Sequence, residues 1–250
     1  MTDTTPPISP EFKQYVHSLV EKSDVRIQSV TWEEKKYWIK RPEHPQGKDK
    51  WLKRHPQALF QHEIDAIAHM NKLQAPAAKM VLHGDNFLVL EDVGTTLNQI
   101  LAQKERSISS KSIIIKQAAS ALAQLHSLDI IHGRPAIRDI AYDGNHIHFI
   151  DFEAQLNLKR LEYNKTRDLL IFIHDLCRNE KYIPHALVLE AIAQYREMKG
   201  EEMWQKALGY VGRFKWLYYF LQLFRPIAHS DLIALYKVFE TVASLKSIPR

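Results

Sequence analysis

Residues 130–153 read IIHGRPAIRDIAYDGNHIHFIDFE, and this stretch decides the fold. Its first part, residues 130–140, has no helical periodicity. The second part alternates apolar and polar residues around Asp143-Gly144, a pair that strongly indicates a tight β-hairpin turn. A carboxylate stands before the hairpin, Asp139, and another ends it, Asp151. The 12 positions between them suit a short hairpin, which can bring the two carboxylates near each other.

The sequence before this stretch predicts a small lobe of strands and helices. A helical apolar spacing in residues 11–23 is followed by two short runs rich in β-branched and aromatic residues, which predict a hairpin. Residues 56–73 show a helical stripe, and residues 78–93 predict a second hairpin around a His-Gly-Asp-Asn turn.

After Gly94 the pattern becomes helical, apart from the hairpin in the opening stretch. We expect helices at residues 95–104, 107–129, 166–178, 185–199, 202–224 and 229–245. The predicted fold class is therefore α+β, with two lobes. Residues 1–93 form a small lobe with an antiparallel sheet, and residues 94–250 form a mainly helical lobe that carries the hairpin.

Composition sets bounds on the function. The chain has 250 residues, a formal charge of +5 and one cysteine, Cys177, so it can form no internal disulfide. The charge fits a phosphate-bearing ligand or an anionic membrane surface, but it is scattered and matches no nucleic-acid-binding motif. No signal peptide is recognised, and the longest apolar run, residues 216–224, is too short to span a bilayer. We expect a cytoplasmic protein that binds no nucleic acid.

Short matches in a fixed order resemble the protein-kinase-like fold, and among its members most closely the bacterial lipopolysaccharide core kinases and RIO-like kinases. Together they cover roughly residues 25–180. The matching segments are YWIK at 37–40, the helix that holds Glu63, FLVLEDVG at 87–94, LHSLDIIHG at 125–133, HFIDFE at 148–153 and TRDLLIF at 166–172.

For the small lobe, the resemblance implies a nucleotide site. Lys40 corresponds to the lysine that holds the nucleotide phosphates, and Glu63 to its acidic partner. Glu91 and Val93 are the expected cofactor-binding positions at the hinge. The glycine-rich loop of protein kinases is missing, because the turn between the first two strands is TWEEKK.

For the large lobe, the resemblance implies metal and loop residues. Asp139, Asp151 and Glu153 correspond to the Mg²⁺ ligands, with Asp-Phe-Glu in place of Asp-Phe-Gly. Asp168 is expected to brace the loop, and His132 to hold the loop and the Asp-Phe segment together through hydrogen bonds.

Arg134 stands where related small-molecule kinases have the aspartate that takes a proton from the acceptor hydroxyl. A guanidinium stays protonated and cannot act as this base. In one interpretation the enzyme is active: either Asp139 also serves the acceptor or the reaction needs no dedicated base, and Arg134 or Arg138 stabilises charge on the phosphoryl group. In a second, the protein is an inactive pseudokinase that binds nucleotide or a partner protein. In a third, the alignment register is wrong.

The favoured hypothesis is an ATP- and Mg²⁺-dependent kinase that acts on a hydroxyl of a sugar or a lipid-linked, lipopolysaccharide-core-type acceptor. The alternative is a pseudokinase that serves as a nucleotide-binding or protein-interaction module. The basic aromatic stretch at residues 212–226 admits peripheral association with the inner membrane surface. Because its aromatic residues are spaced almost all around a helix, we predict instead that this helix is buried.

Overall fold

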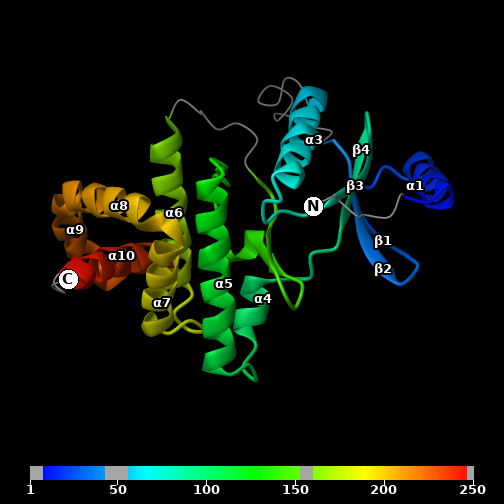
Figure 1. Cartoon of the computed structure of the whole chain (residues 1–250). Helices are drawn as coiled ribbons and strands as arrows, with labels where there is room; N and C mark the ends of the chain where they lie inside the picture. Colours follow the sequence, from blue (N-terminus) through cyan, green and yellow to red (C-terminus); the bar gives the residue numbers. More distant parts are fainter. Residues whose placement is uncertain (1–7, 43–55, 153–159, 247–250) are drawn as a thin grey trace. The chain divides into compact units, whose positions relative to one another are not determined.

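The computed structural model describes residues 8–42, 56–152 and 160–246 of the chain (Figure 1). Its backbone separates into two compact units, Met1–Val93 and Gly94–Arg250. The fold of each unit is described by itself.

The first unit is an antiparallel sheet with two helices. Its strands lie in the order β1-β2-β4-β3. The β1–β2 hairpin turns at Glu33 and Glu34, whose positive φ values of 46° and 64° are those of a type I′ turn. The elements are α1 (Pro10–Lys22), β1 (Ile27–Trp32), β2 (Lys35–Lys40), α3 (Pro56–Lys72), β3 (Met80–Gly84) and β4 (Phe87–Glu91).

Two apolar groups hold this unit together. One side of α1 packs on the sheet, where Phe12 and Val16 meet Ile39 and Val89, all at most 4% exposed. Helix α3 buries residues at the three- and four-residue spacing that the sequence predicts, namely Phe60, Ile64, Ile67 and Met70.

The second unit is mainly helical and contains a small three-stranded sheet in the order β5-β6-β7. Helix α5 packs on α7, and α6 packs on both α8 and α10 (Figure 1). The helices are α4 (Leu97–Ala102), α5 (Ile108–Ser127), α6 (Leu161–Arg178), α7 (His185–Tyr195), α8 (Glu201–Arg213), α9 (Lys215–Leu221) and α10 (Ser230–Lys246). The strands are β5 (Thr95–Thr96), β6 (Ile140–Tyr142) and β7 (Ile147–Phe149), and short helical turns lie at η1 (Ile137–Asp139), η3 (Arg196–Gly200) and η4 (Gln222–Ile227).

The predicted α+β class, with an antiparallel sheet first and a mainly helical region after it, is confirmed. The β6–β7 hairpin turns at the predicted place, and Asp143 stabilises it by accepting hydrogen bonds from the amides of Asn145 and His146 at 2.8 and 2.7 Å. No helix among the described residues is long and apolar enough to cross a bilayer.

The prediction for residues 202–224 is wrong in two respects. The expected single helix breaks at Phe214 (φ −96°, ψ 15°), which separates α8 from α9. Helix α9 was expected to be buried, but none of its residues is. It contacts α10 through one side, where the ring centroids of Tyr218 and Phe239 are 5.3 Å apart. Its other aromatic residues are more than half exposed, namely Trp216 (64%), Tyr219 (60%) and Phe220 (53%).

Candidate active site

The first unit brings Lys40 and Glu63 together. Lys40 lies on β2, an inner strand paired with β1 and β4, and its ammonium forms an ion pair with the Glu63 carboxylate of α3. Glu63 sits between buried Phe60 and Ile64, at the border of the apolar face of α3. Their side chains are 17% and 26% exposed, so the pair is partly buried.

The end of β4 holds the two predicted hinge positions, Glu91 and Val93, and both are half-buried. The residue between them has a structural role that the sequence did not reveal. The carboxylate of Asp92 accepts a hydrogen bond from Trp38 Nε1 at 2.7 Å and pairs with Lys36 Nζ at 3.1 Å. Asp92 thus ties the end of β4 to β2.

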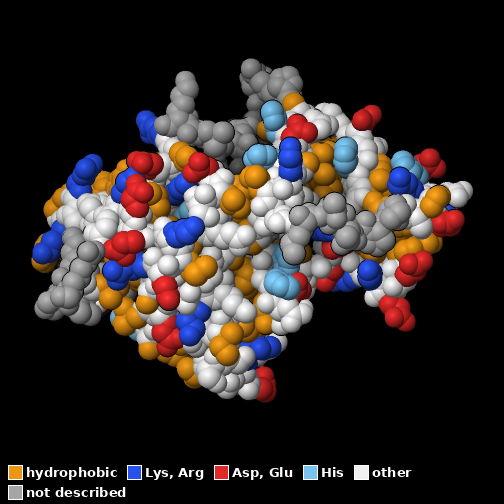
Figure 2. All heavy atoms as spheres, viewed as in Figure 1, with side chains coloured by type: hydrophobic (Ala, Val, Ile, Leu, Met, Phe, Trp, Pro, Cys, Tyr) orange, Lys and Arg blue, Asp and Glu red, His pale blue; other side chains and the backbone are white. Residues whose placement is uncertain are grey.

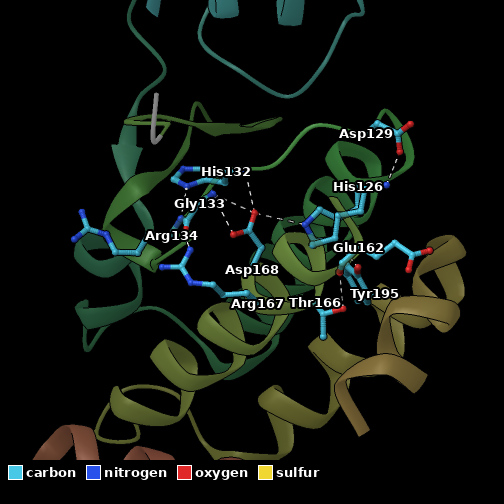
Figure 3. A network of polar contacts seen from close by, with 11 residues as sticks. His126, Asp129, His132, Gly133, Arg134, Glu162, Thr166, Arg167, Asp168 and Tyr195 are labelled. Carbon is cyan, nitrogen blue, oxygen red and sulfur yellow. Dashed lines mark hydrogen bonds and ion pairs between the residues drawn. The ribbon is translucent and has the colours of Figure 1, made fainter. Parts of the chain in front are cut away.

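In the second unit, Asp168 of α6 braces the loop that begins at His132. Its carboxylate is fully buried and accepts hydrogen bonds from the backbone amides of His132 at 2.7 Å and Gly133 at 3.0 Å (Figure 3). The preceding residue of α6, Arg167, donates a hydrogen bond to the carbonyl oxygen of Gly133. The brace expected of Asp168 is therefore present.

A second carboxylate of α6 supports the same loop further on. Asp175 Oδ2 accepts a hydrogen bond from the Ile137 amide at 2.8 Å. Asp168 and Asp175 are seven residues apart and so lie on the same side of the helix, two turns from each other. Sequence reasoning missed Asp175, although this spacing was a readable signal.

His132 links the loop to the segment after β7. Its Nε2 lies 2.9 Å from the carbonyl oxygen of Ile150, which can only accept, so Nε2 carries the proton. Nδ1 accepts from the Arg134 amide at 3.3 Å. The ring also packs against Phe152, with centroids 4.7 Å apart. The predicted structural role of His132 is present.

Asp139 is the buried carboxylate of the loop, with 8% of its side chain exposed. Its Oδ2 has no hydrogen-bond partner within the described ranges of the chain. Burial raises the pKa of Asp139 above its ordinary value, and the positive charges of Arg138 and Arg134 oppose this rise. Their Nε atoms lie 3.6 and 3.7 Å from Oδ2, too far for a hydrogen bond but close enough for ion pairs.

The side chain of Arg134 does not point into the braced part of the loop. Its side chain is half exposed and extends away from His132 and Asp168 (Figure 3). Asp151 is exposed and has a left-handed backbone, with φ +57°. The negative charge of Asp151 adds to the rise in the pKa of Asp139, after the larger effects of burial and of the nearby positive charges.

The described residues contain no group of three or more His, Cys, Asp or Glu side chains arranged to hold a metal ion. The third predicted metal ligand, Glu153, lies outside these residues. Two carboxylates remain for a cation, and hard oxygen donors of this kind suit Mg²⁺, which usually takes its other ligands from phosphates and water.

Behind the brace lies a buried polar pair. The Nε2 atom of His126 faces Asp168 Oδ2 at 3.7 Å, and its Nδ1 lies 2.6 Å from the hydroxyl of Tyr195 (Figure 3). Burial lowers the pKa of His126, and it raises the pKa of Tyr195. Both groups therefore stay neutral at pH 7 and present an uncharged support to Asp168.

Comparisons with known proteins place this geometry in context. The sequence model of the lipopolysaccharide kinase (Kdo/WaaP) family matches residues 11–171. A protein of Haemophilus influenzae described as uncharacterized is 38% identical over 234 residues, which cover 93% of this chain and 96% of that protein. Among solved structures, the chain is similar to APH(2")-IIa in a ternary complex with streptomycin and ATP. The TM-score is 0.49 at 11% identity, and the match covers 90% of this chain and 98% of that one.

Proposed function

This chain belongs to the lipopolysaccharide kinase (Kdo/WaaP) family, and we propose that it transfers the γ-phosphoryl group of ATP to a hydroxyl of a lipopolysaccharide-core-type sugar. The family makes it a phosphotransferase of the kinase type. The observation that carries the proposal is Asp139, a buried carboxylate on a loop that α6 holds at two points. A buried oxygen without a hydrogen bond is costly to keep, and a ligand cation would compensate it.

In the first unit, we assign Lys40 to the nucleotide phosphates. An ammonium fixed by a carboxylate is a compact positive charge in a defined place, which is what phosphate oxygens need. Its partner Glu63 comes from α3, so the lysine is held between a strand and a helix. Glu91 and Val93 remain the proposed contacts for the adenine edge through their backbone groups.

In the second unit, Asp139 and Asp151 are the proposed ligands of Mg²⁺. The fit rests on their chemistry, since both supply hard oxygen atoms and Asp139 Oδ2 lacks a hydrogen-bond donor in the described parts of the chain. When bound, the metal neutralises charge on the β- and γ-phosphates. Glu153 is a third proposed ligand.

The reaction breaks the bond between the bridging oxygen and the γ-phosphorus, and a new bond forms from the acceptor oxygen. The hydroxyl proton needs a destination, and Arg134 cannot take it. We assign this role to Asp139, whose raised pKa makes it a better proton acceptor than an ordinary aspartate. Arg134 and Arg138 can then stabilise the phosphoryl oxygens.

A lipid-linked sugar is presented at a membrane. We therefore propose a cytoplasmic enzyme that associates peripherally with the inner membrane surface, where such an acceptor is within reach.

Thermal denaturation with ATP, with and without Mg²⁺, tests the nucleotide site. We expect stabilisation by ATP with Mg²⁺, little stabilisation by ATP alone, and loss of the metal effect in Asp151→Ala. Lys40→Ala should weaken ATP binding at least about tenfold, because a phosphate contact by an ammonium is worth well over 1 kcal/mol. Lys206→Ala is the matched control, since Lys206 also pairs with carboxylates, those of Glu162 and Glu202.

Turnover of labelled ATP with a lipopolysaccharide-core acceptor tests the chemistry. We expect turnover to survive in Arg134→Ala, with a reduced rate, and to be lost in Asp139→Ala. ATP binding without turnover by the wild-type protein would contradict the transferase and identify a nucleotide-binding module. Absence of both binding and turnover would contradict the whole assignment.

A further inference from the structure

Residues 214–227, which comprise α9 and η4, leave large apolar side chains exposed, and we call this segment the aromatic edge. Seven of the 15 large hydrophobic side chains exposed in the described residues lie in these 14 positions, so the exposure is concentrated and not scattered. The seven, with their exposed fractions, are Phe214 (43%), Trp216 (64%), Tyr219 (60%), Phe220 (53%), Leu223 (74%), Phe224 (40%) and Ile227 (71%).

The aromatic edge is held in place from behind by α10. The hydroxyl of Tyr236 donates to the carbonyl oxygen of Leu221 at 2.5 Å. The ring of Tyr218 packs against Phe239 and lies 6.1 Å from the ring of Tyr236. The exposed side chains therefore stand on an anchored helix and are not those of a frayed terminus.

The charge around the aromatic edge is mainly positive, although Glu240 of α10 pairs with Arg225 at 3.4 Å. Between Glu202 and Asp231 the sequence contains four Lys and Arg residues and no acidic residue. Three of the four, Arg213, Lys215 and Arg225, are exposed at the edge or directly before it. Figure 2 shows orange and blue side chains, with red ones among them, at the end of the second unit where α8, α9 and α10 lie.

We propose that the aromatic edge docks on the surface of an anionic bilayer. Trp, Tyr and Phe side chains favour the boundary between headgroups and acyl chains, and Lys and Arg beside them attract anionic headgroups. A helix that lies in the plane of the interface needs one apolar side and basic flanks, which α9 has. The purpose of the docking rests on the proposed function, since a membrane-linked acceptor would then lie near the enzyme.

A second copy of the chain fits this surface less well. In a two-fold dimer the same patch would face itself, so the cations of one copy would approach those of the other. Residues 203–230 contain no acid that could compensate them, and Glu240 beside the edge already pairs with Arg225. An anionic lipid surface supplies the missing negative charge.

The test is sedimentation of the full chain with vesicles of phosphatidylethanolamine and phosphatidylglycerol, compared with vesicles of phosphatidylcholine. We expect binding to the anionic vesicles that weakens as salt is added. The double variant Trp216→Ser, Leu223→Ser should bind about tenfold more weakly, because it removes apolar area from the docking side. The control Ile108→Ser, Ile113→Ser removes side chains that are 54% and 55% exposed on α5, and it should bind as the wild type does.

A charge reversal tests the electrostatic part. Lys215→Glu should weaken binding to anionic vesicles severalfold at low salt, whereas Lys104→Glu, also at an exposed lysine, should not. No binding of the wild type to anionic vesicles, or equal binding of edge and control variants, would overturn the proposal. So would a concentration-dependent dimer that is lost in Trp216→Ser, Leu223→Ser.

ATP turnover measured without vesicles separates this inference from the proposed function. Edge variants that lose vesicle binding but keep turnover support docking by a surface outside the catalytic residues. Vesicle binding by a protein without any turnover would overturn the kinase proposal and leave the docking surface standing.

Discussion

The carboxylate of Asp168 accepts a hydrogen bond from the backbone amide of His132 at 2.7 Å, across 36 positions of sequence. The same buried carboxylate also accepts from Gly133. A charge without exposure to water is tolerated here because backbone donors satisfy it, and in return it fixes the start of the loop that leads to Asp139.

Asp168→Ala should therefore be strongly destabilising. The substitution leaves two amides without their acceptor, and we expect a loss of about 2–4 kcal/mol in the free energy of unfolding. Urea denaturation measures this loss. Hydrogen exchange at His132 and Gly133 should accelerate more than exchange in α7, because the opening is local.

Asp168→Asn is the matched control, since it keeps one acceptor oxygen and the shape of the side chain. It should lose clearly less stability than Asp168→Ala. If Asp168→Ala were as stable as Asp168→Asn, and the amides of His132 and Gly133 stayed protected from hydrogen exchange in both variants, the bracing role of Asp168 would be refuted.

The buried His126 predicts a pH dependence of stability. Burial lowers its pKa in the folded state, so below pH 6.5 the unfolded chain binds more protons at this site than the folded chain. The stability that comes from keeping His126 neutral is therefore fully present above its unfolded-state pKa of about 6.5. This stability is lost as the pH falls toward the lower pKa of the folded state. We expect stability to decrease between pH 7 and pH 5 by up to about 1.4 kcal/mol per pH unit from this group.

Unfolding in urea at pH 7 and pH 5 checks this, with His126→Gln compared with the wild type. The variant should be less stable at pH 7, because it loses the contact with Tyr195, but its stability should depend less on pH. His146→Gln, at a histidine side chain that is 78% exposed, should keep the wild-type slope. An unchanged slope in His126→Gln would assign the pH dependence to other groups.

Asp139 should show the opposition between function and stability that is common at active sites. Its raised pKa means that the folded chain holds a proton at Asp139 more tightly than the unfolded chain does. Stability therefore falls as the pH rises from the unfolded-state pKa to the folded-state pKa of this group, and it stays lower above that range. Asp139→Asn should therefore be as stable as the wild type at pH 7, or more stable by about 1 kcal/mol, while ATP turnover is lost.

Asp175→Ala is the contrasting variant. Asp175 also supports the loop, but its Oδ2 accepts a hydrogen bond from the Ile137 amide, so its removal should cost about 1–2 kcal/mol. A marked loss of stability in Asp139→Asn, comparable to that of Asp175→Ala, would show that Asp139 serves structure and not ligand binding.

The parts of the fold that the sequence predicted are those with local signals. Lys40 and Glu63 each lie at the border of an apolar pattern, one in a strand and one in a helix, and they meet as expected. The Asp143-Gly144 turn likewise depends on the two residues and their immediate neighbours. The assignments of Lys40, Glu63, Asp139 and Asp151 to nucleotide and metal stay predictions.

The parts that could not be predicted depend on distant contacts. An apolar run such as residues 216–224 has the same pattern in a core helix as on an exposed edge, because burial is decided by what packs on it. Here α8 and α10 contact α9 but leave most of its aromatic side chains exposed.

Gly94 begins the second unit at a position that should accept no other residue. Its φ is +82°, and a Cβ atom there would lie 2.2 Å from the carbonyl oxygen of Tyr142, a backbone atom that cannot move without shifting β6. Gly94→Ala should therefore cost about 2–3 kcal/mol in the free energy of unfolding, from the left-handed backbone and the clash together.

Gly209→Ala is the control, because Gly209 lies in α8 with nothing within 4 Å of the added methyl group. This variant should gain about 0.5–1 kcal/mol from helix propensity. Urea denaturation measures the stability of both variants. A Gly94→Ala protein as stable as the wild type would mean that β5 and β6 do not approach as closely as the structure places them.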